Sequence, residues 1–429
     1  MPSTKKIIDT LTSNNAKAYF SKLYGDNPGV IDSQIQRYQS LADVFITEFP
    51  EQNKLDFFSA PGRTEVGGNH TDHNAGRILA AAVDLDIAAA AAPNNEGVIR
   101  MHSDGYPPDF IDLSDLEVRI AERYSSTAII RGVAARFKQL GYRLGGFDAA
   151  ATSLVPKGSG LSSSAAFEVL IGLILSHFYN NGELDPVLLA KIGQYAENQY
   201  FGKPCGLMDQ TTSAVGGFVA IDFNDFENPI VQQVRFDFAA SGYTLVIVDT
   251  RGDHADLNDE YTALENEMKA VAHALGGKVL REFSAQAVLE QMGVLRGQVS
   301  DRAILRALHF YGDDQRVVEQ VRALESDDFP HFLDLIIESG YSSWMYCQNV
   351  FAPNTVQKQE LAVALAASQG YLQGHGAWRV HGGGFAGTIQ AFVPSTMLTG
   401  YVEIMENIFG EGACHLLRVR PAGGVKMQG

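Results

Sequence analysis

Residues 156–168 combine glycines, three consecutive serines and an apolar run, a pattern typical of a phosphate-binding loop that leads into a helix. The segment reads Pro-Lys-Gly-Ser-Gly-Leu-Ser-Ser-Ser-Ala-Ala-Phe-Glu. Small residues allow backbone N–H groups to converge on an anion, and the N-terminal end of the following helix adds positive charge. An ordinary capped turn after a strand has a similar composition, so this segment needs support from other parts of the chain.

Two other glycine-rich segments carry polar and charged side chains. Residues 61–77 (PGRTEVGGNHTDHNAGR) contain arginine, aspartate and histidine between apolar stretches, and residues 374–387 (GHGAWRVHGGGFAG) lie near the C-terminus. Taken in order, the three segments resemble the signatures GRxNLIGEHTDY, PxGxGLSSSA and GAGFGG of the galactokinases, which are GHMP kinases. The resemblance is specific because order and spacing match as well as composition, over about residues 55–395.

The resemblance implies an α+β protein with the two-domain GHMP kinase fold, in which a ribosomal S5-like N-terminal domain precedes a ferredoxin-like C-terminal domain. We expect a helical extension over residues 1–50, the first domain with the serine-rich loop over 51–235, and the second domain over 236–429. The expected substrates are ATP and a sugar, with Mg²⁺ as the metal and the C1 hydroxyl of galactose or a close relative as the acceptor. The residues expected to bind the nucleotide are Pro156, Gly158, Gly160, Leu161, Ser162, Ser163, Ser164 and Ala165.

Asp209 is the candidate general base, because its segment Pro-Cys-Gly-Leu-Met-Asp-Gln matches the galactokinase sequence PCGIMDQ. Without that match, an aspartate after an apolar pair would be more typical of a helix cap. The resemblance implies that Asp209 takes the proton from the sugar C1 hydroxyl. Arg63 would keep this carboxylate ionised and stabilise the anionic transition state. A surface ion pair is the alternative role for Arg63.

Ser164 and Glu197 are the expected magnesium ligands. Glu197 lies twelve positions before Asp209, as it does in the family. Hard oxygen ligands suit magnesium, which usually retains several waters and binds one carboxylate together with phosphate oxygens. The alternative is that Glu197 is only a solvated glutamate on a polar helix face.

The sugar side of the expected site is formed by residues from three segments. By resemblance, Asp72 binds sugar hydroxyls, His70 lines the sugar pocket, and Tyr261 contacts the sugar. A zinc site formed by His70, Asp72 and His73 is the alternative for the first of these segments. The expected substrate-binding residues are Asn69, His70, Asp72, His73, Tyr261 and Gly383.

Two departures from the family pattern bear on which sugar is bound. The chain has Asn69-His70-Thr71-Asp72-His73 where galactokinases have EHTDY, and Glu65-Val66-Gly67-Gly68 where they have NLIG. In the family, the glutamate of EHTDY accepts a hydrogen bond from the sugar C6 hydroxyl. We expect the neutral Asn69 to remove a negative charge there and to tolerate a C6 carboxylate. Galacturonate, arabinose and N-acetylgalactosamine kinases therefore remain alternatives.

Other nucleotide-binding patterns fit the chain less well. It has no GxxxxGK[ST] loop and no protein-kinase His-Arg-Asp motif. Gly382, Gly384 and Gly387 match GxGxxG, but an alternating, strand-like run follows them instead of the helix of a dinucleotide-binding unit. A non-catalytic sugar sensor on the same fold is disfavoured, because the serine-rich loop retains its Ser-Ala pair and because Arg63 and Asp209 are also present.

Length and composition describe a globular protein of 429 residues, with 45% hydrophobic and 19% charged residues. The net charge of −17 argues against nucleic-acid binding, because there is no excess of Lys and Arg to replace phosphate counterions. The N-terminus lacks an apolar secretion signal, and the apolar stretch 79–92 is too short for a membrane span. With three widely spaced cysteines, we expect a cytoplasmic protein without a membrane partner, either a monomer or a weak homo-oligomer.

The periodicity of apolar residues predicts the elements that position these loops. A helix with its apolar face on Ile35, Tyr38, Leu41 and Phe45 would begin at Asp32 as its N-cap. The polar stretch 224–228 is expected to be a connection, and the domain boundary should lie within 225–242. Strands are expected over 55–59, 78–92, 98–102, 147–154, 218–223, 243–249 and 388–393, and helices over 127–140, 163–179, 186–200 and 258–275, with several shorter helices up to about residue 369.

Overall fold

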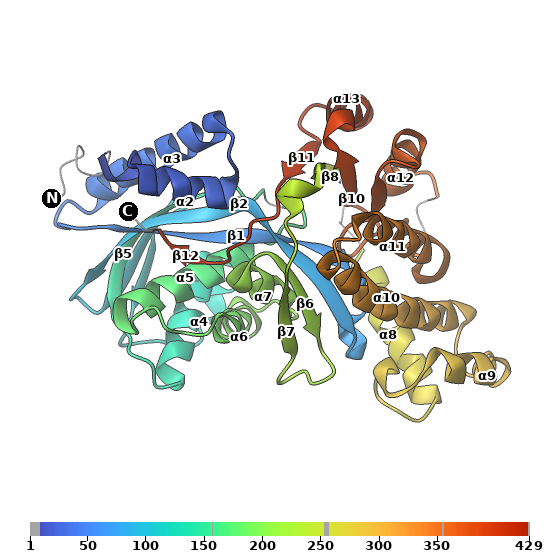
Figure 1. The fold of residues 1–429 in the computed structure, drawn as a ribbon. Helices are drawn as coiled ribbons and strands as arrows, with labels where there is room; N and C mark the ends of the chain where they lie inside the picture. Colours follow the sequence, from blue (N-terminus) through green and yellow to red (C-terminus); the bar gives the residue numbers. More distant parts are fainter. Residues whose placement is uncertain (1–8, 157, 253–256, 354–355, 428–429) are drawn as a thin grey trace.

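The computed structural model describes residues 9–156, 158–252, 257–353 and 356–427, and it folds them around two β-sheets (Figure 1). The larger sheet has the strand order β12-β1-β2-β5-β3-β4, and its β6 pairs with both β2 and β7. Its pairings are antiparallel except for the parallel pair β3 and β5. Its strands are β1 (Asp56–Gly67), β2 (Arg77–Asn94), β3 (Val98–Ser103), β4 (Asp109–Asp112), β5 (Gly146–Ser153), β6 (Phe218–Asp222), β7 (Ile230–Val234) and β12 (Val425–Lys426).

The second sheet is antiparallel and has the order β11-β8-β10-β9. Its strands are β8 (Tyr243–Asp249), β9 (Ala377–Val380), β10 (Thr388–Pro394) and β11 (Cys414–Leu417). The mixed helix and sheet architecture is that of a two-domain α+β protein. The helices are α2 (Asn14–Tyr24), α3 (Pro28–Glu48), α4 (Ser126–Gln139), α5 (Ser163–Tyr179), α6 (Pro186–Ala196), α7 (Met208–Val215), α8 (Asn258–Ala274), α9 (Ala285–Leu295), α10 (Asp301–Glu325), α11 (Phe329–Ser342), α12 (Glu360–Leu372) and α13 (Leu398–Phe409).

Helices cover both faces of the larger sheet, with α2 and α3 on one face and α4 to α7 on the other (Figure 1). Side chains alternate between the two faces along a strand. In β2, Ala89 and Ala91 belong to the cluster that contains α5, whereas Ala88 and Ala90 belong to the cluster that contains α2 and α3. The run of alanines in β2 therefore reflects a strand that is buried on both faces.

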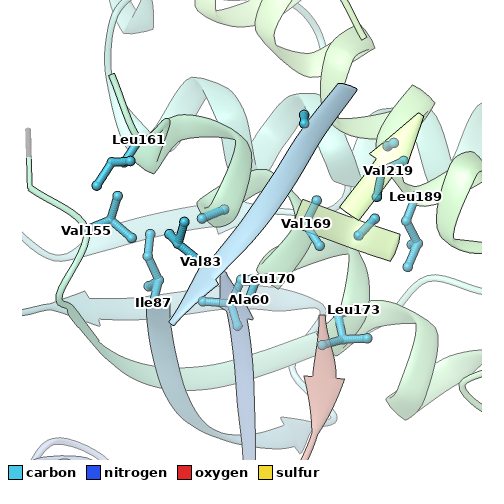
Figure 2. Close-up of a cluster of buried hydrophobic side chains, with 14 of the residues drawn as sticks. Ala60, Val83, Ile87, Val155, Leu161, Val169, Leu170, Leu173, Leu189 and Val219 are labelled. Carbon is cyan, nitrogen blue, oxygen red and sulfur yellow. The ribbon is translucent and has the colours of Figure 1, made fainter. Parts of the chain in front are cut away.

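The phosphate-loop segment is attached to the core of the first domain by Leu161, which is fully buried. Figure 2 shows Leu161 beside Val155, in the same cluster as Val83 and Ile87 of β2 and Val169 of α5. The helix α5 is apolar on all sides, which is typical of a helix enclosed within a core. A loop joined to such a helix has a fixed position relative to β1 and β2.

The N-terminal extension consists of α2 and α3, and residues 1–8 lie outside the described residues. The expectation that Asp32 caps the second of these helices is wrong. Helix α3 begins at Pro28, and the side chain of Asn27 accepts the capping hydrogen bond from Gly29 N. Proline at the first helical position has its φ angle preset for the helix, and the start lies five residues earlier than the apolar pattern suggested.

Several elements differ from the sequence expectation. The stretch 224–228 is a connection, but it leads to β7, an exposed edge strand whose sequence IVQQV lacks a clear apolar alternation. The region in which the sequence predicted several shorter helices, up to about residue 369, contains the 25-residue helix α10. At the other end of the chain, β12 returns to pair with β1 of the first sheet, although these residues were expected in the second domain. Within the described residues, no helix has both the length and the apolar character needed to cross a membrane.

Candidate active site

Arg63 and Asp209 form a two-bond ion pair between the two candidate catalytic residues. Arg63 lies on β1, and Asp209 lies in the first turn of α7. Arg63 Nε donates to Asp209 Oδ1 at 2.7 Å, and Arg63 Nη2 donates to Asp209 Oδ2. The side chain of Asp209 is 28% exposed and makes no capping bond, so it is neither a helix cap nor a closed core group. Its carboxylate is accessible to a ligand while its charge is stabilised by the guanidinium.

The same arginine joins this pair to the phosphate-loop segment. Arg63 Nη1 donates to the carbonyl oxygen of Gly160, and Arg63 N donates to Leu161 O at 2.9 Å. Gly158, Gly160 and Ser162 have positive φ angles of 75°, 74° and 55°, immediately before α5 begins at Ser163. The loop therefore adopts a compact turn in front of a helix N-terminus, which is the geometry that favours an anion.

Ser164 and Glu197 meet beside this loop. Ser164 Oγ donates to Glu197 Oε1 at 3.3 Å, and Glu197 begins the π-helical turn Glu197–Phe201 that follows α6. The hydroxyl and the carboxylate are hard oxygen donors, and they lie next to the segment where phosphates would bind. This donor set fits Mg²⁺ together with phosphate oxygens and water.

A second buried carboxyl group, Glu168, lies close to Glu197 and was not identified from the sequence. Gln210 Nε2 donates to Glu168 Oε2 at 2.9 Å and to Glu197 Oε2 at 3.0 Å. Glu168 is only 1% exposed, and burial together with the negative charge of Glu197 raises its pKa well above the usual range. The available signals were the position of Glu168 one helical turn after Ser164, and the position of Gln210 directly after Asp209.

The loop after β1 contacts the C-terminal glycine loop, so the sugar-side candidates come together. His70 Nε2 lies 2.9 Å from the carbonyl oxygen of Gly383, and the Tyr261 hydroxyl donates to Gly384 O at 3.0 Å. Burial and the neighbouring His73 lower the pKa of His70 to about 4. His70 is therefore neutral near pH 7 and presents one N–H donor and one acceptor.

The remaining members of the 70–73 segment lie nearer to solvent. The side chain of Asp72 is 23% exposed and that of His73 is 41% exposed, with His73 Nε2 at 3.5 Å from Asp72 Oδ1. Among the described residues, no group of three His, Cys, Asp or Glu side chains is arranged to hold a metal ion. This gives the zinc alternative no geometric support. A cavity of about 930 Å³ opens beside Asp72, between Gly206 and helix α6.

Asn69 is fully buried, and its amide group is bonded entirely within the protein. Its Nδ2 donates to Glu65 Oε1 at 2.9 Å and to Gly382 O at 2.8 Å, and its Oδ1 accepts from Asn349 Nδ2 at 2.8 Å. Glu65 places a carboxylate in direct contact with Asn69, so the expectation that Asn69 removes a negative charge from the sugar C6 position stays a prediction. A direct contact between Asn69 and a sugar stays a prediction.

A second cavity, of about 430 Å³, lies beside Ser163 and Ser164 at the start of α5. It was not predicted from the sequence. Ser163, Ser164 and Phe167 of α5 form one wall, and Tyr106 and Phe201 lie in other walls. The lining is mainly apolar and includes the side chains of Ser163 and Ser164. A cavity of this size and character fits a flat heterocycle attached to a phosphorylated sugar.

Comparisons with known proteins agree with this geometry. Residues 128–217 match the family described as the GHMP kinases N terminal domain, and residues 43–93 match the galactokinase galactose-binding signature. A galactokinase of Streptomyces coelicolor is 32% identical over 368 residues, which cover 84% of this chain and 90% of the relative.

The fold is also found in solved structures. Lactococcus lactis galactokinase, solved in complex with galactose, has a TM-score of 0.76 at 22% identity, over 91% of this chain and 99% of that one. Methanococcus jannaschii mevalonate kinase has a TM-score of 0.60 at 15% identity, over 86% and 99% of the two chains. Fold and sequence together define a GHMP kinase. Within that class, the chain belongs to the galactokinase family, and it is a sugar kinase, that is, a phosphotransferase with an alcohol acceptor.

Proposed function

We propose that this kinase transfers the γ-phosphoryl group of ATP to the C1 hydroxyl of galactose or a close relative. The observation that carries the proposal is the contact of Arg63 with both Asp209 and Gly160, which joins the candidate base to the phosphate-loop segment. The relatives named galactokinase, including the one solved with galactose, support the choice of sugar.

In the proposed reaction, Asp209 accepts the proton of the C1 hydroxyl as the sugar oxygen attacks the γ-phosphorus. The new bond joins the sugar oxygen to phosphorus, and the bond between phosphorus and the bridging oxygen of ADP breaks. Arg63 orients Asp209 through two hydrogen bonds and would balance negative charge between the carboxylate and the phosphoryl group. Phosphoryl transfer depends mainly on positioning and electrostatic stabilisation, which these fixed groups would supply.

Nucleotide binding is assigned to the loop 156–165 and the adjoining 430 Å³ cavity. The adenine ring would occupy the apolar part near Phe167 and Phe201, and the phosphates would lie at the N-terminus of α5. Ser164 and Glu197 would hold Mg²⁺, which supplies charge neutralisation at the phosphates when it is bound. On the sugar side, His70, Asp72, Tyr261 and the carbonyl groups of the glycine loop offer the hydrogen-bonding groups that a hexose requires.

The direct test is a screen of free sugars with purified protein and MgATP, with ADP release as the readout. We expect turnover with galactose or a closely related sugar. Phosphorus NMR of the product should show a phosphate on C1, because only that position would face Asp209. Phosphorylation at another hydroxyl, or ADP release that does not depend on a sugar, would contradict the proposal.

A further inference from the structure

At two positions of the family signature, this chain has the amide and the carboxylate exchanged: Glu65 replaces an asparagine, and Asn69 replaces a glutamate. The pattern GRxNLIGEHTDY, aligned on Arg63, has asparagine where this chain has Glu65 and glutamate where it has Asn69. In the structure the two side chains are hydrogen-bonded, with Asn69 Nδ2 at 2.9 Å from Glu65 Oε1. The two departures therefore lie in one contact, and the pair carries the same formal charge as its counterpart in the signature.

The orientation of Glu65 is fixed from two sides. Its Oε1 also accepts from Arg379 Nη2 at 3.1 Å, and Arg379 is fully buried and bonded to the carbonyl oxygens of Val66 and Val380. A guanidinium stays protonated at any accessible pH. An ionised Glu65 is thus the natural partner of Arg379, because a buried cation without a counter-charge is costly.

One carboxylate oxygen of Glu65 remains open. Within the described part of the chain, Glu65 Oε2 accepts no hydrogen bond, and the side chain keeps 10% of its surface exposed. Burial raises the pKa of Glu65, and the charge of Arg379 opposes this shift. Glu65 lies two residues after Arg63 on β1 with no bulge between them, so the two side chains are on the same face of the strand. Asn69, in contrast, has both amide hydrogens and its carbonyl oxygen engaged, and it is 0% exposed.

We propose that Glu65, held in place by Asn69 and Arg379, supplies the fixed carboxylate on the sugar side of the site, and that the enzyme therefore selects a neutral sugar over the corresponding uronic acid. This inference rests on the proposed function, because the acceptor must lie next to Asp209, Arg63 and Asp72. An acidic sugar would bring a second negative charge towards Glu65 and Asp72. Both nearby guanidiniums are already engaged, Arg63 by Asp209 and Arg379 by Glu65.

The test compares galactose with galacturonate, which differ only in the C6 group. The wild-type protein should have the higher kcat/KM with galactose. In Glu65→Gln, which keeps the shape and removes the charge, the ratio of galactose to galacturonate should fall tenfold or more. Asp148→Asn is the control. Asp148 is a buried carboxylate on β5 that is paired with Arg100 of β3, and its loss should leave the ratio unchanged.

The pair itself is tested by exchanging its members. Asn69→Glu alone places two carboxylates in contact and should lower the melting temperature and the activity with both sugars. The double variant Glu65→Asn/Asn69→Glu restores one amide and one carboxylate, and it should regain the melting temperature and the preference for galactose. A double variant no better than Asn69→Glu would contradict the pairing.

Each result bears on a separate claim. A folded Glu65→Gln protein with an unchanged ratio, or a wild-type preference for galacturonate, would overturn this inference and leave the kinase assignment intact. If the wild-type protein turned over neither of these sugars and no other sugar of the screen, the proposed function would fail. Calorimetric binding of galactose and galacturonate to the wild type and Glu65→Gln would then decide whether Glu65 discriminates between them: a ratio of binding constants shifted tenfold would support the inference, and an unchanged one would overturn it.

Discussion

Asp209 accepts hydrogen bonds from Arg63 on both carboxylate oxygens and still keeps 28% of its side-chain surface exposed. Each oxygen retains a lone pair that could take a proton, so the ion pair does not block a role as base. Single substitutions can test how far catalysis depends on this pair.

Asp209→Asn should lower kcat by roughly 10²–10⁴-fold, because the amide keeps the shape but cannot accept the proton. The KM values for sugar and ATP should change little. Arg63→Ala should also lower kcat, and the loss in the double variant should be smaller than the product of the single losses, since the two residues act as a unit. Steady-state kinetics with both substrates provide the measurement.

Asp301→Asn is a matched control, because Asp301 also accepts two hydrogen bonds from one arginine, Arg296, but on the exposed surface. Its kcat should equal that of the wild type. An Asp209→Asn protein that keeps more than about a tenth of the wild-type kcat would remove Asp209 from the role of base.

Ser164→Ala and Glu197→Gln should each raise the Mg²⁺ concentration that gives half-maximal rate, since both residues are proposed metal ligands. Gln210→Leu should act in the same direction, because Gln210 orients Glu197 without being a ligand itself. Binding of Mn²⁺ in the presence of ADP, followed by electron paramagnetic resonance, measures the metal site independently of turnover. Unchanged Mn²⁺ affinity in folded Ser164→Ala and Glu197→Gln proteins would exclude them as ligands.

Among the secondary-structure elements, the N-terminal helices pack on the sheet through an apolar cluster and are also bonded to it through one buried carboxylate. Asp86 of β2 is fully buried and accepts from Arg37 of α3 at 2.6 Å, from Tyr24 of α2 at 2.6 Å and from Arg420 at 3.1 Å. Burial alone would raise the pKa of Asp86, but Arg37 and Arg420 lower it below its usual value. The carboxylate thus joins the extension, the sheet and the C-terminal segment.

Asp86→Asn should destabilise the protein by about 3–5 kcal/mol, because it leaves two buried guanidiniums without their counter-charge. Urea unfolding gives the change in free energy. Asp43→Asn on the exposed side of α3 is the control, and it should change stability by less than about 0.5 kcal/mol. If Asp86→Asn lowered the free energy of unfolding as little as the control does, the hydrogen bonds of Asp86 would contribute little to docking the extension.

Long apolar elements were predictable from the sequence, whereas short edge strands and distant pairings were not. Helix α5 and strand β8 have the bounds expected from their apolar runs. Strands β7 and β12 are short and partly exposed, so no apolar alternation reveals them. The Arg63–Asp209 pair followed from a motif match. The contact of Glu65 with Arg379 depends on how the two domains pack, and the departure from the family pattern at Glu65 does not by itself reveal this partner.

In the whole molecule, the two sheets are joined through a buried polar seam centred on His381. Its Nε2 lies 3.0 Å from Thr64 Oγ1 on β1, and its Nδ1 lies 2.8 Å from Thr388 Oγ1 on β10. Gln390 of β10 also donates to Thr64 Oγ1, at 2.7 Å. The hydrogen bonds in this seam hold Arg63 and the glycine loop in one relative position. The protonation state of His381 therefore affects the stability of the whole enzyme.

Burial, together with the Arg63 and Arg379 cations, lowers the pKa of His381 to about 3. In the unfolded chain this pKa is about 6.5, so below pH 6.5 the unfolded state binds a proton that the native state excludes. Stability should therefore fall as the pH falls through this window, by about 2 kcal/mol from His381 between pH 7 and 5. His70, with a pKa of about 4, acts in the same direction, and Asp84, with a pKa raised to about 6 by burial, acts in the opposite one.

His381→Gln isolates this contribution, because glutamine can hydrogen-bond the same threonines but does not titrate. The free energy of unfolding is measured in urea at pH 7 and at pH 5. Its decrease between the two pH values should be about 2 kcal/mol smaller in the variant than in the wild type. His375→Gln, which replaces an exposed histidine, should leave the wild-type difference unchanged. Equal differences for the wild type and His381→Gln would mean that His381 takes up its proton in the native state, and that the seam between the domains opens or rearranges before the protein unfolds.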